Sequence, residues 1–277
     1  MISFNLKKYF YCSRKKWLIA IIVLLVLAVI LKYIVGYDFL PVGKQLTLWD
    51  YIFASLSYPF AMLLVIPLLY CYLVADIITK DYEGGYVTFL LSRSSCRLEY
   101  FLSKVIIIFV TSNIFFFIYL MILFLVGLIY GIPSNGASYF TVTSTILESG
   151  GTIFNAIIMQ YSLFVTLLYL LGILSVTVSL IFNKSLYSYI FIAGLILHGH
   201  NTVFNNHNNL PYSPLAQGIM SFHYPFYYRG LNNMTEISES IQRFSIGYSI
   251  VYLSLLLFVF FLVGFIRIRT MNLFLKD

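Results

Sequence analysis

Long apolar stretches constrain this chain more than any other feature of its sequence. A helix rises about 1.5 Å per residue and the hydrocarbon core of a bilayer is about 30 Å thick, so roughly 20 mostly apolar residues suffice to cross it. One stretch, residues 185–204, is marginal, because polar residues from His198 onward end its apolar run, and by length it either spans or re-enters on the same side. Five stretches meet the requirement with ease: residues 17–36, 51–75, 105–130, 155–182 and 246–266.

The composition supports a membrane protein and excludes several other classes. The chain is 61% apolar and 10% charged, whereas soluble domains are about 45–50% apolar and about 25% charged. The excess apolar surface must therefore contact lipid. This composition excludes a cytosolic enzyme, a nucleic-acid-binding protein and a secreted disulfide scaffold. Cys12, Cys71 and Cys96 share no CxxC spacing, which favours packing thiols over a zinc or redox pair.

The distribution of Lys and Arg predicts the topology. If the N-terminus is cytoplasmic and all six segments span, most of the 17 basic residues fall inside, as the positive-inside rule requires. Only Lys32, Lys44, Arg229 and Arg243 fall outside or at outer helix ends. If residues 185–204 did not cross, the last span would export Arg267, Arg269 and Lys276. We therefore expect an all-α polytopic protein with six transmembrane helices and both termini in the cytoplasm.

The first 16 residues predict an amphipathic helix at the membrane interface. Ile2, Leu6, Tyr9, Phe10 and Ser13 share one helical face, and four basic residues lie off it: Lys7, Lys8, Arg14 and Lys15. An unstructured basic anchor is the alternative. Residues 17–277 then form a single transmembrane domain that includes an inner loop at residues 76–104 and a long outer segment at residues 201–245.

The inner loop is the most informative part of the chain. Residues 76–104 read DIITKDYEGGYVTFLLSRSSCRLEYFLSK, which is far longer than a reversal of direction needs. The loop contains a Gly-Gly pair, a short apolar run at residues 86–91 and a Ser/Arg turn. It predicts either a short helix along the inner face with an apolar side for another protein, or a solvated connector.

At this loop the chain resembles the ABC-2-type permeases, the membrane subunits of type-2 ATP-binding-cassette exporters. The shared sequence motif is confined to the loop, whereas the order of predicted spans and loops is similar over nearly the whole chain. The chain departs from the family pattern at Ser92, where a proline is often found, and at Tyr86, where a threonine commonly follows the glycines. The residues that carry the likeness form an acidic–glycine–LeuLeu–SerArg–Lys pattern: Glu83, Gly84, Gly85, Leu90, Leu91, the Ser92–Arg97 turn and Lys104.

The resemblance implies partners and a mechanism. The permease would form a dimer, with itself or with a related subunit, bound to two cytoplasmic ABC ATPase subunits, and its inner loop would be the coupling helix that docks on the ATPase. Glu83, Arg93 and Arg97 would supply polar contacts. The apolar contacts would come from Tyr86, Phe89 and Leu90. The full set of implied coupling residues is Tyr82, Glu83, Gly84, Gly85, Tyr86, Phe89, Leu90, Leu91, Arg93, Arg97 and Lys104.

The chain carries no recognisable energy source of its own. No G-x-x-x-x-G-K-[ST] motif occurs, and no Asp or Glu lies inside a predicted span to couple transport to ions. We therefore expect no cofactor in this chain, with ATP and Mg²⁺ bound by the partner subunit. The neutral polar residues Asn113, Gln160 and Thr166 lie within spans, where they either pack helices together or line a substrate pathway.

Enzymatic chemistry has little support in the sequence. His198, His200, His207 and His223 cluster near the outer face, but no H-E-x-x-H motif or flanking carboxylate accompanies them, so neither a metal site nor a catalytic residue is predicted.

Together with these features, the resemblance implies a permease of a bacterial plasma membrane that exports a peptide, an antimicrobial compound or another amphipathic molecule. Two alternatives are a non-transporting membrane anchor or sensor that binds a partner through the inner loop, and a membrane enzyme that uses the outer histidines.

Overall fold

A computed structural model describes residues 2–83, 97–134, 137–182, 185–205, 207–224 and 244–270. The secondary structure in these ranges is helical, and each long apolar run forms a helix. Five helical stretches are long and apolar enough to cross a membrane: Ser3–Ile34, Phe60–Asp81, Arg97–Ile129, Ile153–Phe182 and Ile246–Thr270. The long helices are α1 (Ile2–Ile34), α6 (Arg97–Ile129), α8 (Ile153–Phe182), α9 (Ser185–Asn205) and α12 (Ile246–Thr270).

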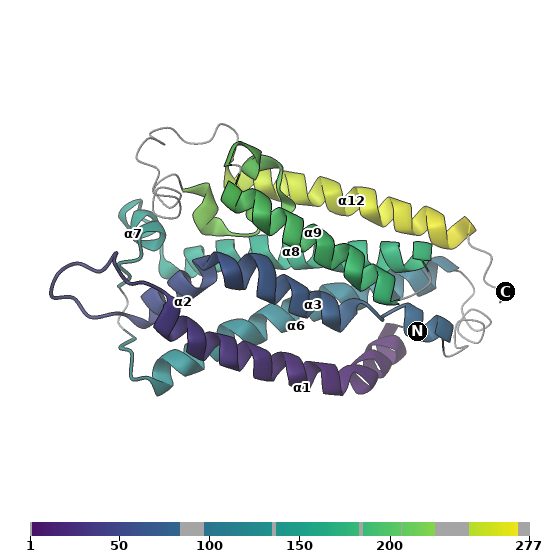
Figure 1. The fold of residues 1–277 in the computed structure, drawn as a ribbon, viewed down its shortest axis with the longest axis horizontal. Helices are drawn as coiled ribbons and strands as arrows, with labels where there is room; N and C mark the ends of the chain where they lie inside the picture. The colour runs from purple at the N-terminus through teal and green to yellow at the C-terminus, as the bar shows by residue number, and fades with distance from the viewer. Residues whose placement is uncertain are drawn as a thin grey trace.

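The long helices form an elongated bundle with two different ends (Figure 1). One end holds the start of α1, the start of α6 and the end of α12, where Arg97 Nη1 donates to the Arg269 carbonyl oxygen at 3.1 Å. We call it the charged end, because the ion pairs described below lie there. The opposite end carries short helices and is called the capped end: α7 (Thr141–Glu148), η2 (His207–Tyr212), α10 (Pro214–Gln217) and η3 (Met220–His223).

Helix α9 runs along α8 as a single element. Its 21 residues correspond to about 31 Å, and Ser188 Oγ near its start donates to the Ser175 carbonyl oxygen of α8 at 2.8 Å. Its far end lies against the capped end, where Gly199 approaches Leu215. The segment at 185–204 is therefore one continuous helix along the bundle, although it is less apolar than the five candidate spans.

The second predicted span, residues 51–75, is interrupted near its start. Helix α2 (Leu48–Ser57) ends before Pro59, and the chain continues as the π-helix η1 (Phe60–Val65) and then as α3 (Ile66–Val74). Proline lacks a backbone N–H and clashes with the preceding turn, which explains a break here. A turn after α3 leads to the short helix α4 (Thr79–Glu83) at the charged end.

Helix α1 is continuous across residues 16 and 17, where the sequence suggested a boundary between an interfacial segment and the first span. Its 33 residues correspond to about 50 Å, longer than the hydrocarbon core of about 30 Å. Figure 1 shows that the N-terminal part bends away from the axis of the remainder. The N-terminal part is thus helical and packs against the charged end of the bundle.

Helix α8 lies at the centre and packs against α3, α6, α9 and α12. A Cβ at Gly172 would come within 2.2 Å of Ile108 Cγ2 and 2.8 Å of the Tyr70 hydroxyl oxygen. Only glycine therefore allows α3 and α6 to approach α8 this closely. Gln160 of α8 fastens the capped end, because its Nε2 donates to the Gly218 carbonyl oxygen at 3.1 Å and its Oε1 accepts from Met220 N at 2.9 Å.

Asp50 organises the other half of the capped end. Its fully buried carboxylate caps α2 by accepting from Thr47 N at 3.0 Å and Thr47 Oγ1 at 2.7 Å. The other carboxylate oxygen accepts from Ser138 Oγ at 2.8 Å, Tyr139 N at 2.6 Å and Phe140 N at 2.9 Å. One side chain thereby fixes the loop that leads into α7.

Asp50→Ala is expected to destabilise the protein by about 2–4 kcal/mol, because several buried donors lose their acceptor together. The thermal unfolding midpoint in detergent measures the effect. Asp38→Asn, at an exposed position in the adjoining loop, is the control and should unfold close to wild type. Equal midpoints for Asp50→Ala and Asp38→Asn would show that the carboxylate does not organise the loop.

Candidate functional site

A buried ion-pair network at the charged end is centred on Asp81 of α4. Asp81 Oδ1 pairs with Lys8 Nζ of α1 at 2.7 Å, and Asp81 Oδ2 pairs with Lys104 Nζ of α6 and accepts from the Tyr100 hydroxyl at 3.0 Å. The Asp81 and Lys104 side chains are 4% and 5% exposed. A lysine is almost never buried to this extent without a partner. The network therefore ties α1, α4 and α6 together through a single carboxylate.

Asp76 forms a second centre in the turn between α3 and α4. Its Oδ2 pairs with Lys16 Nζ at 2.8 Å and with Lys80 Nζ at 2.5 Å. Lys16 Nζ also donates to the Tyr72 carbonyl oxygen at 3.1 Å. The two aspartates thus pair with four lysines. Helix α1 is attached to α4 through Lys8 and to the α3–α4 turn through Lys16, about two helical turns further along.

Neutral hydrogen bonds complete the attachment of the N-terminal part of α1. Asn5 Nδ2 donates to Ser103 Oγ at 2.9 Å, and the Tyr9 hydroxyl donates to the Leu73 carbonyl oxygen at 3.2 Å. Cys12 and Ser13 border a cavity of about 200 Å³ beside the ion pairs. The face of α1 that carries Tyr9 and Ser13, identified from the sequence as its apolar face, thus packs against protein here.

The network lies next to both ends of the segment formed by residues 84–96. Residues 84–96 follow α4 and precede α6, and the Asp81–Lys104 and Asp81–Tyr100 contacts join the two sides of this segment. A push or pull on the segment would thus act on α1, α4 and α6 together. Among the predicted coupling residues, Lys104 is part of the network and Arg97 contacts α12, as described above.

The other predicted coupling residues divide into two groups. Tyr82 and Glu83 lie in α4, but the positions of their side chains are outside what the structure describes. The rest lie outside the described residues altogether: Gly84, Gly85, Tyr86, Phe89, Leu90, Leu91 and Arg93.

The predicted pathway residues do not share one site. Gln160 holds the capped end through both amide atoms. Asn113 Nδ2 donates to the Phe109 carbonyl oxygen at 2.8 Å while its Oδ1 accepts from the Tyr161 hydroxyl at 3.0 Å. Thr166 Oγ1 donates to the Ser162 carbonyl oxygen at 2.7 Å. The bonds of Gln160 and Asn113 join different elements and support a packing role, whereas the bond of Thr166 lies within α8.

The described histidine side chains, those of His198, His200 and His223, lie at or near the capped end. Within the described ranges, no three His, Cys, Asp or Glu side chains are close enough to hold a metal ion. His198 lies on α9, and His223 is part of η3, where its ring stacks on Phe244 at 4.5 Å. His223 Nδ1 is 3.1 Å from the carbonyl oxygens of Ile219 and Met220, and Nε2 is 2.6 Å from Ser249 Oγ.

Burial lowers the pKa of His223 to about 4, although its two backbone carbonyl acceptors act in the opposite direction. The pKa of an unfolded histidine is about 6.5, so the unfolded chain binds more protons between these values. This contribution to stability is complete above pH 6.5 and is lost as the pH falls towards 4.

We therefore expect the thermal midpoint of the wild type to fall between pH 6.5 and pH 4.5 more steeply than that of His223→Asn. His198→Asn, at an exposed position on α9, should keep the wild-type pH dependence. If the His223→Asn and wild-type curves are parallel across this range, His223 is not the titrating group.

The described structure defines the class of the protein as an all-helical chain, with five helices able to cross a membrane and a buried ion-pair network at one end of the bundle. The chain belongs to the family described as "Protein of unknown function (DUF2705)", whose family model matches residues 17–274. No curated protein matches the chain.

Proposed function

We propose that this protein is the permease subunit of an ABC exporter of the ABC-2 type, which moves its substrate with energy from ATP hydrolysed on separate cytoplasmic ATPase subunits. The observation that carries the proposal is the Asp81 network, which anchors both sides of the inner loop to α1 and α6. The pattern of Glu83 to Lys104 in the sequence supports the same assignment.

The network suits a loop that transmits force. A coupling element must pass the motion of its partner to the spans and not absorb it in a flexible connection. Buried ion pairs and hydrogen bonds hold their geometry because breaking one leaves an uncompensated charge. Motion of residues 84–96 therefore reaches α6 through Lys104 and α1 through Lys8, and Asp76 adds a second connection through Lys16.

The proposal places six crossings in the membrane with both termini in the cytoplasm. Helix α9 is long enough for the sixth crossing, and its polar end at residues 198–202 lies towards the capped end, where the interface would be. The lysines of the network then lie on the cytoplasmic side, as the positive-inside rule favours. The expected location is a bacterial plasma membrane.

A second copy of the permease and lipid are the expected neighbours of the outer helices. Large apolar side chains are exposed along α1 and α12, including Leu25, Leu255 and Phe258. In a bilayer these faces contact lipid tails or another permease. A bundle without Asp or Glu in its predicted spans suits an amphipathic cargo such as a peptide or an antimicrobial compound better than a free ion.

Co-purification tests the coupling loop. The tagged chain is expressed with a Walker-motif ATPase encoded beside it, and the ATPase retained on the tag is measured. Arg93→Glu with Arg97→Glu should abolish retention, whereas Lys44→Glu with Arg229→Glu makes the same charge change on the opposite side and should retain the ATPase. Unchanged retention by the Arg93/Arg97 variant would reject the proposal. Retention together with unaltered ATP hydrolysis would favour an anchor or sensor.

A further inference from the structure

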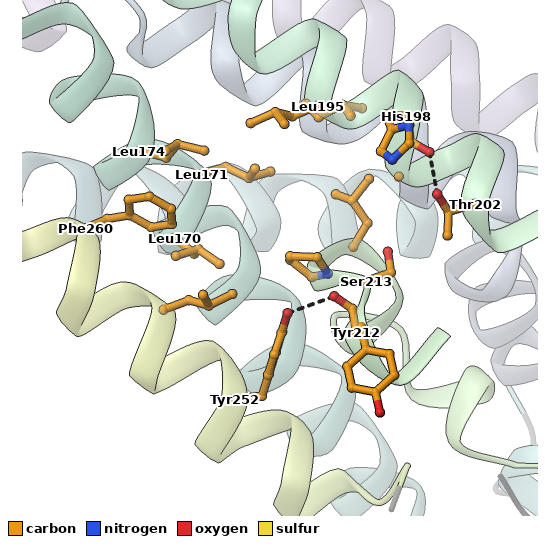
Figure 2. Close-up of a pocket in the computed structure, with 15 residues that line it drawn as sticks. Leu170, Leu171, Leu174, Leu195, His198, Thr202, Tyr212, Ser213, Tyr252 and Phe260 are labelled. Atoms are coloured by element: carbon orange, nitrogen blue, oxygen red, sulfur yellow. Dashed lines mark hydrogen bonds between the residues drawn. The ribbon is translucent and has the colours of Figure 1, made fainter. Parts of the chain in front are cut away.

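A second cavity lies away from the charged end, between α8, α9 and α12, with a volume of about 460 Å³. Leu170, Leu171 and Leu174 of α8 line its floor, and α9 and α12 supply its walls (Figure 2). Both wall helices pack along α8 but make little direct contact with each other. The volume falls within the range of about 300–1,000 Å³ that is typical of small-molecule sites.

The polar groups of the cavity gather at one end. The segment from Tyr212 to Leu215 closes the cavity towards the capped end, and His198 and Thr202 of α9 lie beside it. Thr202 Oγ1 donates to the His198 carbonyl oxygen at 2.9 Å, and the Tyr252 hydroxyl donates to the Tyr212 carbonyl oxygen at 2.7 Å. The remaining lining is almost wholly aliphatic or aromatic, with no Asp, Glu, Lys or Arg among the lining residues.

Ser213 gives this polar end an unused hydrogen-bonding group. The residue is 6% exposed, and its hydroxyl oxygen is buried without a hydrogen-bond partner in the described structure. Ser213 precedes α10 at the N-cap position, yet its side chain makes no capping bond. Leaving a buried hydroxyl unbonded costs about 1–3 kcal/mol, so a ligand that bonds to it would remove a cost already present in the free protein.

We propose that this cavity binds a single-chain amphiphile that enters from the bilayer, with its hydrocarbon chain between Leu171 and Leu256 and a neutral hydrogen-bonding group at Ser213. An apolar body matches the leucine-rich floor and walls. A neutral head group matches a lining without charged side chains, because a buried charge there would be unpaired. Leu195 of α9 lines the cavity and is also exposed on the outer surface, which suits entry from hydrocarbon.

The proposed binding site does not depend on ATP-driven transport. An amphiphile can bind in the cavity whether or not it is then transported. The experiment therefore measures binding alone, without an ATPase. A negative result would reject the binding site without rejecting the coupling loop, and a negative co-purification result would not reject the binding site.

Photolabelling of the full chain in phosphatidylcholine nanodiscs tests the proposal. The probe is a 12-carbon alcohol that carries a diazirine near the end of its chain, and unlabelled dodecanol is the competitor. We expect saturable labelling on the residues that line the cavity. Ser213→Ala should weaken binding of the alcohol by about three- to tenfold, the effect of one hydrogen bond, without weakening the matched hydrocarbon probe.

Variants that fill the cavity provide the second arm. Leu195→Trp and Leu256→Trp, from opposite walls, should reduce labelling by the alcohol and the hydrocarbon alike. Leu186→Trp is the matched control, because Leu186 is an exposed α9 residue outside the cavity lining. The thermal midpoint of each variant verifies folding, and Ser213→Ala should not fall below wild type since it removes no bond.

Three results would overturn the proposal. The first is unsaturable labelling spread over the exposed faces of α1 and α12, which is ordinary contact with lipid. The second is equal labelling in the wild type and both tryptophan variants. The third is disulfide formation between two copies of Leu195→Cys in a background without the native cysteines, which would mean that a second permease covers the cavity.

Discussion

Asp81→Asn is expected to leave little folded protein at physiological temperature. The substitution keeps the size of the side chain but removes the negative charge that faces Lys104, whose side chain is 5% exposed. Breaking a buried ion pair by removing one partner costs about 3–5 kcal/mol, a large part of a total stability of about 5–15 kcal/mol. The thermal midpoint in detergent and the yield of monodisperse protein measure the loss.

Two further variants separate this effect from a general sensitivity of the charged end. Lys80→Met removes a lysine next to Asp81 in sequence, but Lys80 is 45% exposed and Asp76 keeps Lys16, so a loss below about 1 kcal/mol is expected. Asp81→Asn combined with Lys104→Met removes both members of the buried pair and should recover part of the stability. Equal losses for Asp81→Asn and Lys80→Met would refute a special role for the buried pair.

Impermeant maleimide labelling should give all-or-none results that depend on which side of the membrane is exposed. Cys12 is an exposed free thiol at the charged end, and in a Cys71→Ser, Cys96→Ser background it is the one native thiol left. It should react in inside-out vesicles and not in right-side-out cells. Lys44 lies in an exposed loop beyond the other end of α1. In a background without the native cysteines, Lys44→Cys should react in right-side-out cells and not in inside-out vesicles.

The reverse pattern would place residues 84–96 outside the cell, away from any cytoplasmic ATPase, and would reject the proposed coupling. Labelling of both positions from the same side would mean that α1 does not cross the membrane. Detergent-solubilised protein, in which both thiols should react, is the control for reagent access.

Segment length and apolar content are enough to predict most of the helices. The predicted segments at 155–182 and 246–266 lie inside α8 and α12, and the segment at 105–130 lies in α6 except for its last residue, because a continuous apolar run of this length favours a helix whatever its neighbours. Pro59 marks the break in the second segment for a local reason, the missing N–H of proline. The membrane crossing of α9 and the orientation of the termini stay predictions.

The charge network could not be read from the sequence in the same way. Asp81 and Lys8 are 73 positions apart, and Asp81 and Lys104 are 23 apart, so no local spacing links them. A usable signal was the rarity of charge itself: in a chain with 10% charged residues, an aspartate or lysine beside an apolar run favours a buried partner. Asn5 and Ser103 had no such signal, because their contact depends on how α1 bends. Tyr100 had none either, because its contact with Asp81 depends on how α4 lies beside α6.

ATP hydrolysis in reconstituted proteoliposomes tests the central claim most directly. The purified chain, the purified ATPase and both together are compared, with a variant in which residues 84–96 are replaced by a Gly/Ser linker of equal length, which behaves as a flexible coil. The account predicts no hydrolysis by the chain alone, a rate for the pair well above that of the ATPase alone, and loss of this increase in the linker variant. An increase that survives the linker replacement, or ATP hydrolysis by the purified chain alone, would contradict it.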